Sequence, residues 1–235
     1  MKIIPAILPL RYYDIPEGIE KILGAVDTVQ IDFVDGHFAS NRTWWFNNKN
    51  ADRLADLLSQ NEGLPHWESM NYEFDLMIKD PIAIIDTILA LGPSRIIFHV
   101  EGLDQAKTLE YFETMPEIVH STISFGMAIG VGTDPESIRP YIEYIDTVQC
   151  MAIANVGFQG QAFDQRVIAQ VQKIKELYPD KTIAVDGAMN EETIPKVAQA
   201  GATVFVVGSA VFQSATIHGT IQRLQWHAEN SRQEN

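Results

Sequence analysis

Eight short apolar runs rich in β-branched residues alternate with longer segments of helical periodicity, and this alternation limits the fold more than any other feature. Strands and helices in alternation form parallel sheets, because each helix returns the chain to the same edge of the sheet. The predicted strands are residues 3–8, 29–34, 74–78, 96–100, 122–129, 148–153, 182–185 and 204–207. Eight units in 235 residues are about 29 residues each, the scale of a βα unit. The sequence therefore predicts an α/β fold, a single (β/α)8 TIM barrel.

The helical segments lie between these runs, and two of them begin with a recognisable signal. We predict helices at residues 15–24, 51–59, 82–91, 135–144, 165–177 and 191–200. Asp80-Pro81 and Asp134-Pro135 place a side-chain acceptor at the N-cap and a proline at the first helical position. A polar segment follows Trp226. We therefore assign residues 1–226 to one barrel domain and residues 227–235 to a polar C-terminal tail that frays.

The charge balance argues against several kinds of partner. The chain has 17 Lys and Arg against 31 Asp and Glu, a net charge of −14, which repels nucleic acid and anionic membrane surfaces. No apolar run approaches the roughly 18–20 residues that a membrane-spanning helix needs. The single cysteine, Cys150, cannot form an internal disulfide and fits a reducing compartment. We expect a cytoplasmic protein with a buried Cys150 and with no nucleic-acid or membrane partner.

Polar residues at the carboxyl ends of strands are the candidates for chemistry, because the active site of a TIM barrel lies at that end. Asp32, Asp75 and Asp186 lie at or near the ends of three predicted strands, and Gln30 shares a strand face with Asp32. Three carboxylates in a barrel mouth repel one another, so they take up protons, pair with bases or bind a cation. We favour a divalent cation, held by the three carboxylates and the Gln30 carbonyl oxygen. Oxygen ligands favour magnesium or manganese over zinc.

Glycine-rich loops follow the last three predicted strands, at residues 156–161, 186–188 and 208–209. Glycine lets backbone N–H groups approach an anion closely, and we expect Ser209 to open the final helix. A phosphate site after strands seven and eight is frequent in TIM barrels. We therefore predict that a phosphate group binds the N–H groups of Gly160, Gly187, Ala188, Gly208 and Ser209.

For other residues near the strand ends we expect structural roles rather than catalytic or metal-binding ones. His37 and His99 offer further metal ligands, but we expect each to be a buried histidine that bonds to a backbone carbonyl. The aromatic cluster Trp44-Trp45-Phe46 could form a substrate lid, a subunit contact or packing inside the chain, and we favour packing or a subunit contact. We expect a homo-oligomer.

Seven short motifs follow one another along the chain. They are Pro5-Ala6-Ile7-Leu8, Asp32-Phe33-Val34-Asp35-Gly36-His37-Phe38, Leu76-Met77, Phe98-His99-Val100-Glu101, Gly157-Phe158-Gln159-Gly160-Gln161, Val185-Asp186-Gly187-Ala188 with Asn190, and Gly208-Ser209-Ala210-Val211-Phe212. Their order and spacing resemble those of the ribulose-phosphate 3-epimerase family, nearly from end to end. The resemblance implies a TIM barrel of the ribulose-phosphate-binding type and an isomerase of pentose phosphate metabolism.

The resemblance also implies a mechanism and assigns residues to it. Family members invert carbon 3 of a ketopentose phosphate with the help of a metal ion that stabilises an enediolate. One Asp removes the proton from one face and a second Asp returns it on the other; these roles fall on Asp32 and Asp186. The implied contacts to the phosphorylated sugar are Ala6, Gly157, Phe158, Gln159, Gly160, Gly187, Ala188, Gly208 and Ser209. The substrate would be D-ribulose 5-phosphate, D-xylulose 5-phosphate or a related sugar phosphate.

The chain departs from the family pattern at the metal site. The family holds its metal with two His and two Asp, whereas Gln30 and Asp75 stand at the two His positions here. Further departures are Ala6 in place of a substrate-contacting Ser, Val34 in place of a Met, Ala188 in place of a Gly, and a one-residue insertion around Asn155-Val156.

These departures leave three functions open. The first is an epimerase with an oxygen-rich metal site, and the retained Asp32 and Asp186 place it first. The second is a sugar-phosphate lyase of the same barrel superfamily, against which the same two residues count. The third is a non-catalytic sugar-phosphate-binding homologue, for which the two replaced histidines are the best argument.

Overall fold

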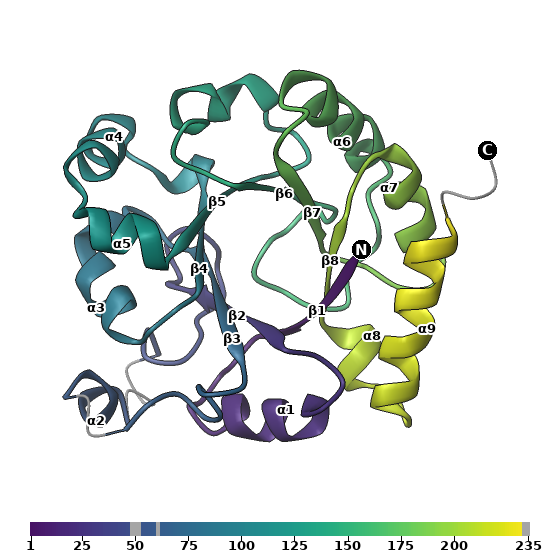
Figure 1. The fold of residues 1–235 in the computed structure, drawn as a ribbon, viewed down its shortest axis with the longest axis horizontal. Helices are drawn as coiled ribbons and strands as arrows, with labels where there is room; N and C mark the ends of the chain where they lie inside the picture. Colours follow the sequence, from purple (N-terminus) through teal and green to yellow (C-terminus); the bar gives the residue numbers. More distant parts are fainter. Residues whose placement is uncertain (48–52, 60–61, 232–235) are drawn as a thin grey trace.

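The computed structural model describes residues 1–47, 53–59 and 62–231, which form a closed barrel of eight parallel strands in chain order (Figure 1). The strands are β1 (Lys2–Ile7), β2 (Thr28–Val34), β3 (Asn71–Met77), β4 (Arg95–His99), β5 (Ser124–Ile129), β6 (Thr147–Met151), β7 (Thr182–Asp186) and β8 (Val204–Val207). Because β1 pairs with both β2 and β8, the sheet has no free edge. The predicted TIM barrel and its eight strands are confirmed.

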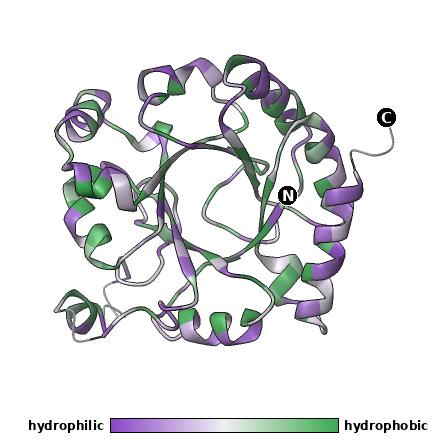
Figure 2. Ribbon diagram, viewed as in Figure 1, coloured by the Kyte–Doolittle hydropathy of each residue, from purple (hydrophilic) through white to green (hydrophobic). Residues whose placement is uncertain are grey.

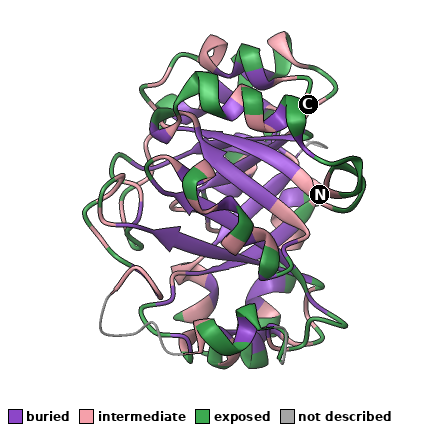
Figure 3. Cartoon of the chain, turned by 90° about the vertical axis from the view of Figure 1, so that its left-hand side faces the viewer, coloured by how far each residue is buried: buried purple, intermediate pink, exposed green. Residues whose placement is uncertain are grey.

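Helices surround the barrel and cover its outer face (Figure 1). They are α1 (Asp14–Ile22), α2 (Leu54–Leu58), η1 (Pro81–Ile84), α3 (Ile85–Ala90), η2 (Val100–Gly102), α4 (Gln105–Thr114), α5 (Glu117–Thr122), η3 (Pro135–Tyr141), α6 (Arg166–Leu177), α7 (Ile194–Ala200), α8 (Ser209–Phe212) and α9 (Ile217–Asn230). In α1, for example, Ile15, Ile19 and Ile22 are buried, and polar residues alternate with them along the helix (Figure 2). The strands are buried almost throughout, whereas the helices expose their outer faces (Figure 3).

The predicted helix at residues 82–91 is split into the 3₁₀ helix η1 and the short helix α3. Asp80 precedes η1 with a φ of +56° and makes no side-chain capping hydrogen bond. Its Oδ2 instead accepts a hydrogen bond from Lys107 Nζ at 2.8 Å. The predicted Asp80 cap is therefore wrong, because the left-handed backbone and the Lys107 contact turn the carboxylate away from the helix start.

We expect Asp134→Ala to lower the unfolding free energy by about 1 kcal/mol, since Asp134 does cap the 3₁₀ helix η3. Its Oδ1 accepts a hydrogen bond from the Glu136 N–H at 3.0 Å. For a domain of this size the loss corresponds to a melting temperature lower by about 2–4 °C. Asp134→Ser keeps a capping oxygen and should melt close to the unmodified protein in differential scanning calorimetry. Equal losses in both variants would contradict the capping role.

The last helix, α9, continues past the predicted domain boundary at residues 226–227. It ends at Asn230, and Ala228 and Ser231 are buried. Gln225 Nε2 also donates a hydrogen bond to the Met1 carbonyl at 2.8 Å, which fixes α9 against the start of β1. The predicted fraying is therefore not seen at residues 227–231, and residues 232–235 lie outside the described residues. None of the described helices is long and apolar enough to cross a membrane.

The aromatic cluster at residues 44–46 belongs to the internal packing. Trp44 is fully buried and its ring lies 5.2 Å from that of Tyr12 and 6.4 Å from that of Phe33, centroid to centroid. Trp45 packs on Phe33 with the centroids 4.7 Å apart. These contacts hold the segment after β2 against the outside of the barrel, so packing is the interpretation that the structure supports.

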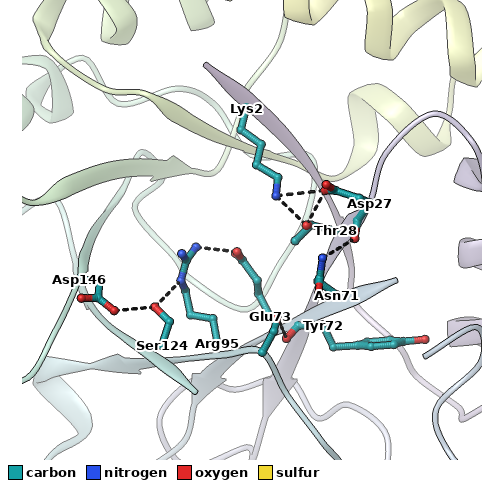
Figure 4. A network of polar contacts seen from close by, with 10 residues as sticks. Lys2, Asp27, Thr28, Asn71, Tyr72, Glu73, Arg95, Ser124 and Asp146 are labelled. Carbon is teal, nitrogen blue, oxygen red and sulfur yellow. Dashed lines mark hydrogen bonds and ion pairs between the residues drawn. The ribbon is translucent and has the colours of Figure 1, made fainter. Parts of the chain in front are cut away.

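The amino-terminal end of the barrel is closed by a network of polar side chains (Figure 4). Lys2 Nζ lies 3.1 Å from Asp27 Oδ1 and donates to Thr28 Oγ1 at 2.7 Å. Arg95 donates to Glu73 Oε1 at 2.6 Å. We call these residues, with Asn71, Ser124 and Asp146, the barrel floor. In TIM barrels this end serves stability, and the chemistry lies at the opposite end.

Candidate active site

Three carboxylates meet inside the carboxyl-terminal end of the barrel. Asp32 on β2 lies opposite Asp75 on β3 in the sheet register, and Asp186 is the last residue of β7. Each offers an oxygen that lies within 4.8 Å of those from the other two. All three side chains are buried, and Asp75 is fully so. The structure thus brings together the three acidic residues that the strand ends indicated.

Gln30 holds two of these carboxylates from β2. Its Nε2 donates to Asp32 Oδ1 at 2.9 Å and to Asp186 Oδ2 at 3.2 Å, while its Oε1 is buried with no hydrogen-bond partner in the described chain. Gln30 is therefore part of the cluster, but it presents its N–H₂ group rather than the expected carbonyl oxygen. The reason is local, because two carboxylate oxygens lie within reach of one amide donor.

His99, at the end of β4, pairs with Asp75. Its Nε2 lies 2.8 Å from Asp75 Oδ1, and Phe38 covers the imidazole with the ring centroids 5.0 Å apart. Burial disfavours the imidazolium, but the negative charge of Asp75 and the hydrogen bond outweigh it and raise the pKa of His99. The expected backbone-carbonyl partner is wrong for His99, because a carboxylate on the neighbouring strand takes that place. His37 is exposed and lies outside the cluster.

Burial and mutual repulsion raise the pKa of two carboxyl groups. For Asp32, burial followed by the charges of Asp186 and Asp75 raises the pKa well above its usual value. For Asp186, burial followed by the charge of Asp75 raises the pKa to about 7. The Gln30 amide opposes both shifts by donating to the ionised forms. Such a cluster can take up and release protons near neutral pH, or it can release its protons and bind a cation.

A cavity opens at the carboxylates. Its lining includes Asp32 and Asp186, whereas Gln30 and Asp75 are fully buried and do not line it. All nine residues that the sequence assigned to sugar-phosphate contacts also line it: Ala6, Gly157, Phe158, Gln159, Gly160, Gly187, Ala188, Gly208 and Ser209.

The loop after β7 shows why small residues stand at the cavity wall. Gly187 has a φ of +99°, and a Cβ atom there would lie 2.8 Å from Ile153 Cγ2. Ala188 has a φ of +54°, a left-handed conformation that costs an L-residue about 1–2 kcal/mol. The Ala188 carbonyl accepts a hydrogen bond from Thr193 Oγ1 at 2.8 Å, which holds this conformation. The backbone of residues 187–188 is therefore fixed where it borders the cavity.

Ser209 opens α8, a helix of only four residues, and the final helix begins at Ile217. The expectation that Ser209 opens the final helix is therefore wrong. The chain turns between the two helices, where Ser214 Oγ accepts a hydrogen bond from the Thr216 N–H and pairs with Thr220 Oγ1. Anion binding at this cavity would consequently rest on the backbone of three loops rather than on the dipole of a long helix.

Gln149 is a site residue that the sequence analysis missed. It lies on β6, and its Nε2 is 3.4 Å from Asp75 Oδ2 and 3.5 Å from Asp186 Oδ2. A signal was present, because Gln149 is a polar residue in an apolar strand and lies two positions before Met151, on the same strand face. Met151 also lines the cavity.

The donor set of the cluster fits a divalent cation. Three carboxylate oxygens lie within 4.8 Å of one another, and the amide of Gln149, whose Oε1 is buried with no hydrogen-bond partner in the described part of the chain, contacts two of the carboxylates. Carboxylate and amide oxygens are the ligands that hard cations prefer. The nearby imidazole nitrogen of His99 is already engaged by Asp75.

Comparisons with known proteins identify the family of the chain. A model of the ribulose-phosphate 3-epimerase family matches residues 2–212. Ribulose-phosphate 3-epimerase of Aquifex aeolicus is 29% identical to this chain over 226 residues, which are 94% of each chain. Ribulose-phosphate 3-epimerase of Rhodobacter capsulatus is 31% identical to it over 220 residues, which are 92% of this chain and 88% of the relative. A solved 3-keto-L-gulonate-6-phosphate decarboxylase from Vibrio cholerae shares the fold, with a TM-score of 0.69 and 11% identity over 98% of this chain and 97% of that one. The chain belongs to the ribulose-phosphate 3-epimerase family and is an isomerase.

Proposed function

We propose that the protein inverts carbon 3 of a ketose phosphate, such as D-ribulose 5-phosphate, by acid–base catalysis with Asp32 and Asp186. The observation that carries this proposal is that both carboxylates line one cavity together with the three glycine-rich loops. They come from β2 and β7, which are not adjacent in the barrel, so they approach a bound sugar from different strands. Inversion needs a proton carrier on each face of a planar intermediate.

The carboxylates of Asp32, Asp75 and Asp186 would also hold a divalent cation, with manganese or magnesium favoured over zinc. The all-oxygen donor set supports this identity. When bound, the cation stabilises negative charge that develops on the sugar oxygens during proton removal. Gln30 keeps Asp32 and Asp186 in place through its N–H₂ group.

In the proposed reaction Asp32 removes the proton from carbon 3 on one face, and Asp186 delivers a proton to the other face. Asp186 lines the same cavity as Asp32, so its carboxyl group can donate a proton to a sugar bound there. The backbone at Gly160, Gly187 and Ser209 would hold the phosphate group and so fix carbon 3 relative to the two carboxylates.

Ser209→Asp should raise KM for a ketose phosphate about 30-fold or more, because it places a negative charge at the cavity wall where the phosphate would bind. A like-charge contact costs at least about 2 kcal/mol, and about 1.4 kcal/mol corresponds to a tenfold change. Ala215→Asp makes the same change of net charge at an exposed position and should leave KM unaltered. A KM equal in both variants, measured by steady-state kinetics, would exclude a phosphate site at Ser209.

Product analysis separates this proposal from the alternatives. A panel of ketose phosphates is incubated with the protein and Mn²⁺ in D₂O and followed by NMR. An epimerase exchanges and inverts carbon 3, whereas a lyase, the class suggested by the decarboxylase of similar fold, shortens the carbon chain. A sugar-phosphate-binding protein without activity leaves every substrate unchanged. Chain cleavage or no reaction would each overturn the proposal.

We propose a homo-oligomer, which light scattering tests directly. A cytoplasmic location is supported by Cys150, which is fully buried in β6 and has its thiol pKa raised to about 12 by burial. Such a thiol is inert and needs no oxidising environment.

A further inference from the structure

Gln149 is a fully buried amide that is only loosely held. Its Nε2 makes long contacts of 3.4 Å to Asp75 Oδ2 and 3.5 Å to Asp186 Oδ2, and one of 3.8 Å to the Met151 sulfur. Its Oε1 has no hydrogen-bond partner within the described residues. The side chain thus reaches the carboxylate cluster with weak donor contacts and an unsatisfied acceptor.

Gln30 provides the contrast within the same cluster. Its Nε2 donates at 2.9 Å to Asp32 and at 3.2 Å to Asp186, so rotating this amide would break two well-formed hydrogen bonds. Rotating the Gln149 amide would exchange its nitrogen and oxygen at the cost of long contacts only, because the terminal torsion of glutamine is broad. The rotation turns Oε1 toward the oxygens of Asp75 and Asp186.

We infer that Gln149 supplies an amide oxygen to the cation held by Asp32, Asp75 and Asp186. The inference rests on the cation site of the proposed function and adds a ligand from β6 to it. A neutral oxygen ligand adds to the coordination without a further negative charge among three carboxylates. Gln30 keeps its hydrogen bonds and acts as a positioning residue.

Mn²⁺ titration by calorimetry, without substrate, tests the inference first. Gln149→Met keeps the length of the side chain and removes its oxygen, and it should weaken Mn²⁺ binding at least about 10-fold. Gln170→Met is the matched control, because Gln170 is another buried glutamine with an unpartnered Oε1; it lies on α6 and its Nε2 donates to the carbonyls of Gly130 and Thr133 rather than to the carboxylates. The control should bind Mn²⁺ like the unmodified protein.

A second variant separates coordination from mere hydrogen bonding. Gln149→His offers a nitrogen ligand, so the affinity for Zn²⁺ relative to Mn²⁺ should rise at least about 10-fold if position 149 touches the ion. A ratio that stays unchanged would overturn the inference. If the variants do not fold, Mg²⁺ added to the ¹⁵N-labelled unmodified protein should shift the side-chain amide signals of Gln149 but not those of Gln170. Unshifted Gln149 signals at saturating Mg²⁺ would also overturn it.

These outcomes distinguish the inference from the function on which it rests. An unmodified protein that binds neither Mn²⁺ nor Mg²⁺ would overturn both the ligand role of Gln149 and the proposed cation site. If Gln149→Met binds Mn²⁺ as tightly as the unmodified protein does, the ligand role of Gln149 alone is overturned and the proposed epimerisation stands.

Discussion

Asp186→Asn and Asp32→Asn should each reduce the rate of carbon-3 epimerisation by about 10²–10⁴-fold, the usual contribution of a positioned acid or base. Asn keeps the shape of the side chain and removes its ability to carry a proton. In D₂O, a variant that retains one base should still exchange the carbon-3 proton on one face without inverting the centre. The rates are measured by NMR on D-ribulose 5-phosphate with Mn²⁺ present.

The control for this pair is Asp146→Asn, a substitution in the barrel floor at the opposite end of the barrel. It makes the same chemical change away from the cavity and should leave the rate unaltered. Circular dichroism spectra of all three variants should match that of the unmodified protein. Near-full epimerisation by either Asp32→Asn or Asp186→Asn would refute the two-base mechanism.

The metal-free protein should lose stability as the pH rises from about 4 to about 7. The pKa of Asp186 is raised to about 7 in the folded protein from 3.8, so the folded state binds more protons than the unfolded state across this interval. The unfolding free energy therefore falls with pH, by at most about 4 kcal/mol for this one group. Asp32, whose pKa is raised for the same reasons, acts in the same direction. Urea unfolding between pH 4 and pH 8, with chelator present, measures the effect.

Two comparisons test the cause of this pH dependence. Asp186→Asn carries no titrating group at position 186 and should show a flatter profile. Saturating Mn²⁺ at pH 8 should restore stability, because a ligand that binds only the folded state stabilises it. A metal-free protein that is equally stable at pH 5 and pH 8 would show that burial and mutual repulsion do not raise the pKa of these carboxyl groups.

The fold could be predicted because its signal is local. Each strand is a short apolar run bounded by polar residues, and its length and period distinguish it from a helix. The predicted strand boundaries are wrong where contacts with other parts of the chain, and not the local pattern, fix the start of the strand. β3 begins three residues before its predicted start, at Asn71, since Glu73 faces the interior and is paired with Arg95. β5 begins at Ser124, two residues after its predicted start, because α5 extends to Thr122.

The candidate site could be predicted only in part, because its residues come from strands far apart in sequence. Period-two alternation shows which residues face the interior, and this placed Asp32 and Asp75 on one side of their strands. It does not give the height of one strand relative to a non-adjacent one, which depends on the stagger of the closed barrel. The contacts of Gln30 with Asp186 and of Gln149 with Asp75 join non-adjacent strands and follow from that stagger.

The polar floor of the barrel has a consequence for how this chain can diverge. Lys2 ties the start of β1 to that of β2 through Asp27 and Thr28, and the Glu73–Arg95 pair ties β3 to β4; none of these residues lines the cavity. Substitutions at the mouth, where the chemistry resides, therefore leave the pairing that closes the other end intact. Such a division lets the binding loops and the ligand set change in evolution while the scaffold persists.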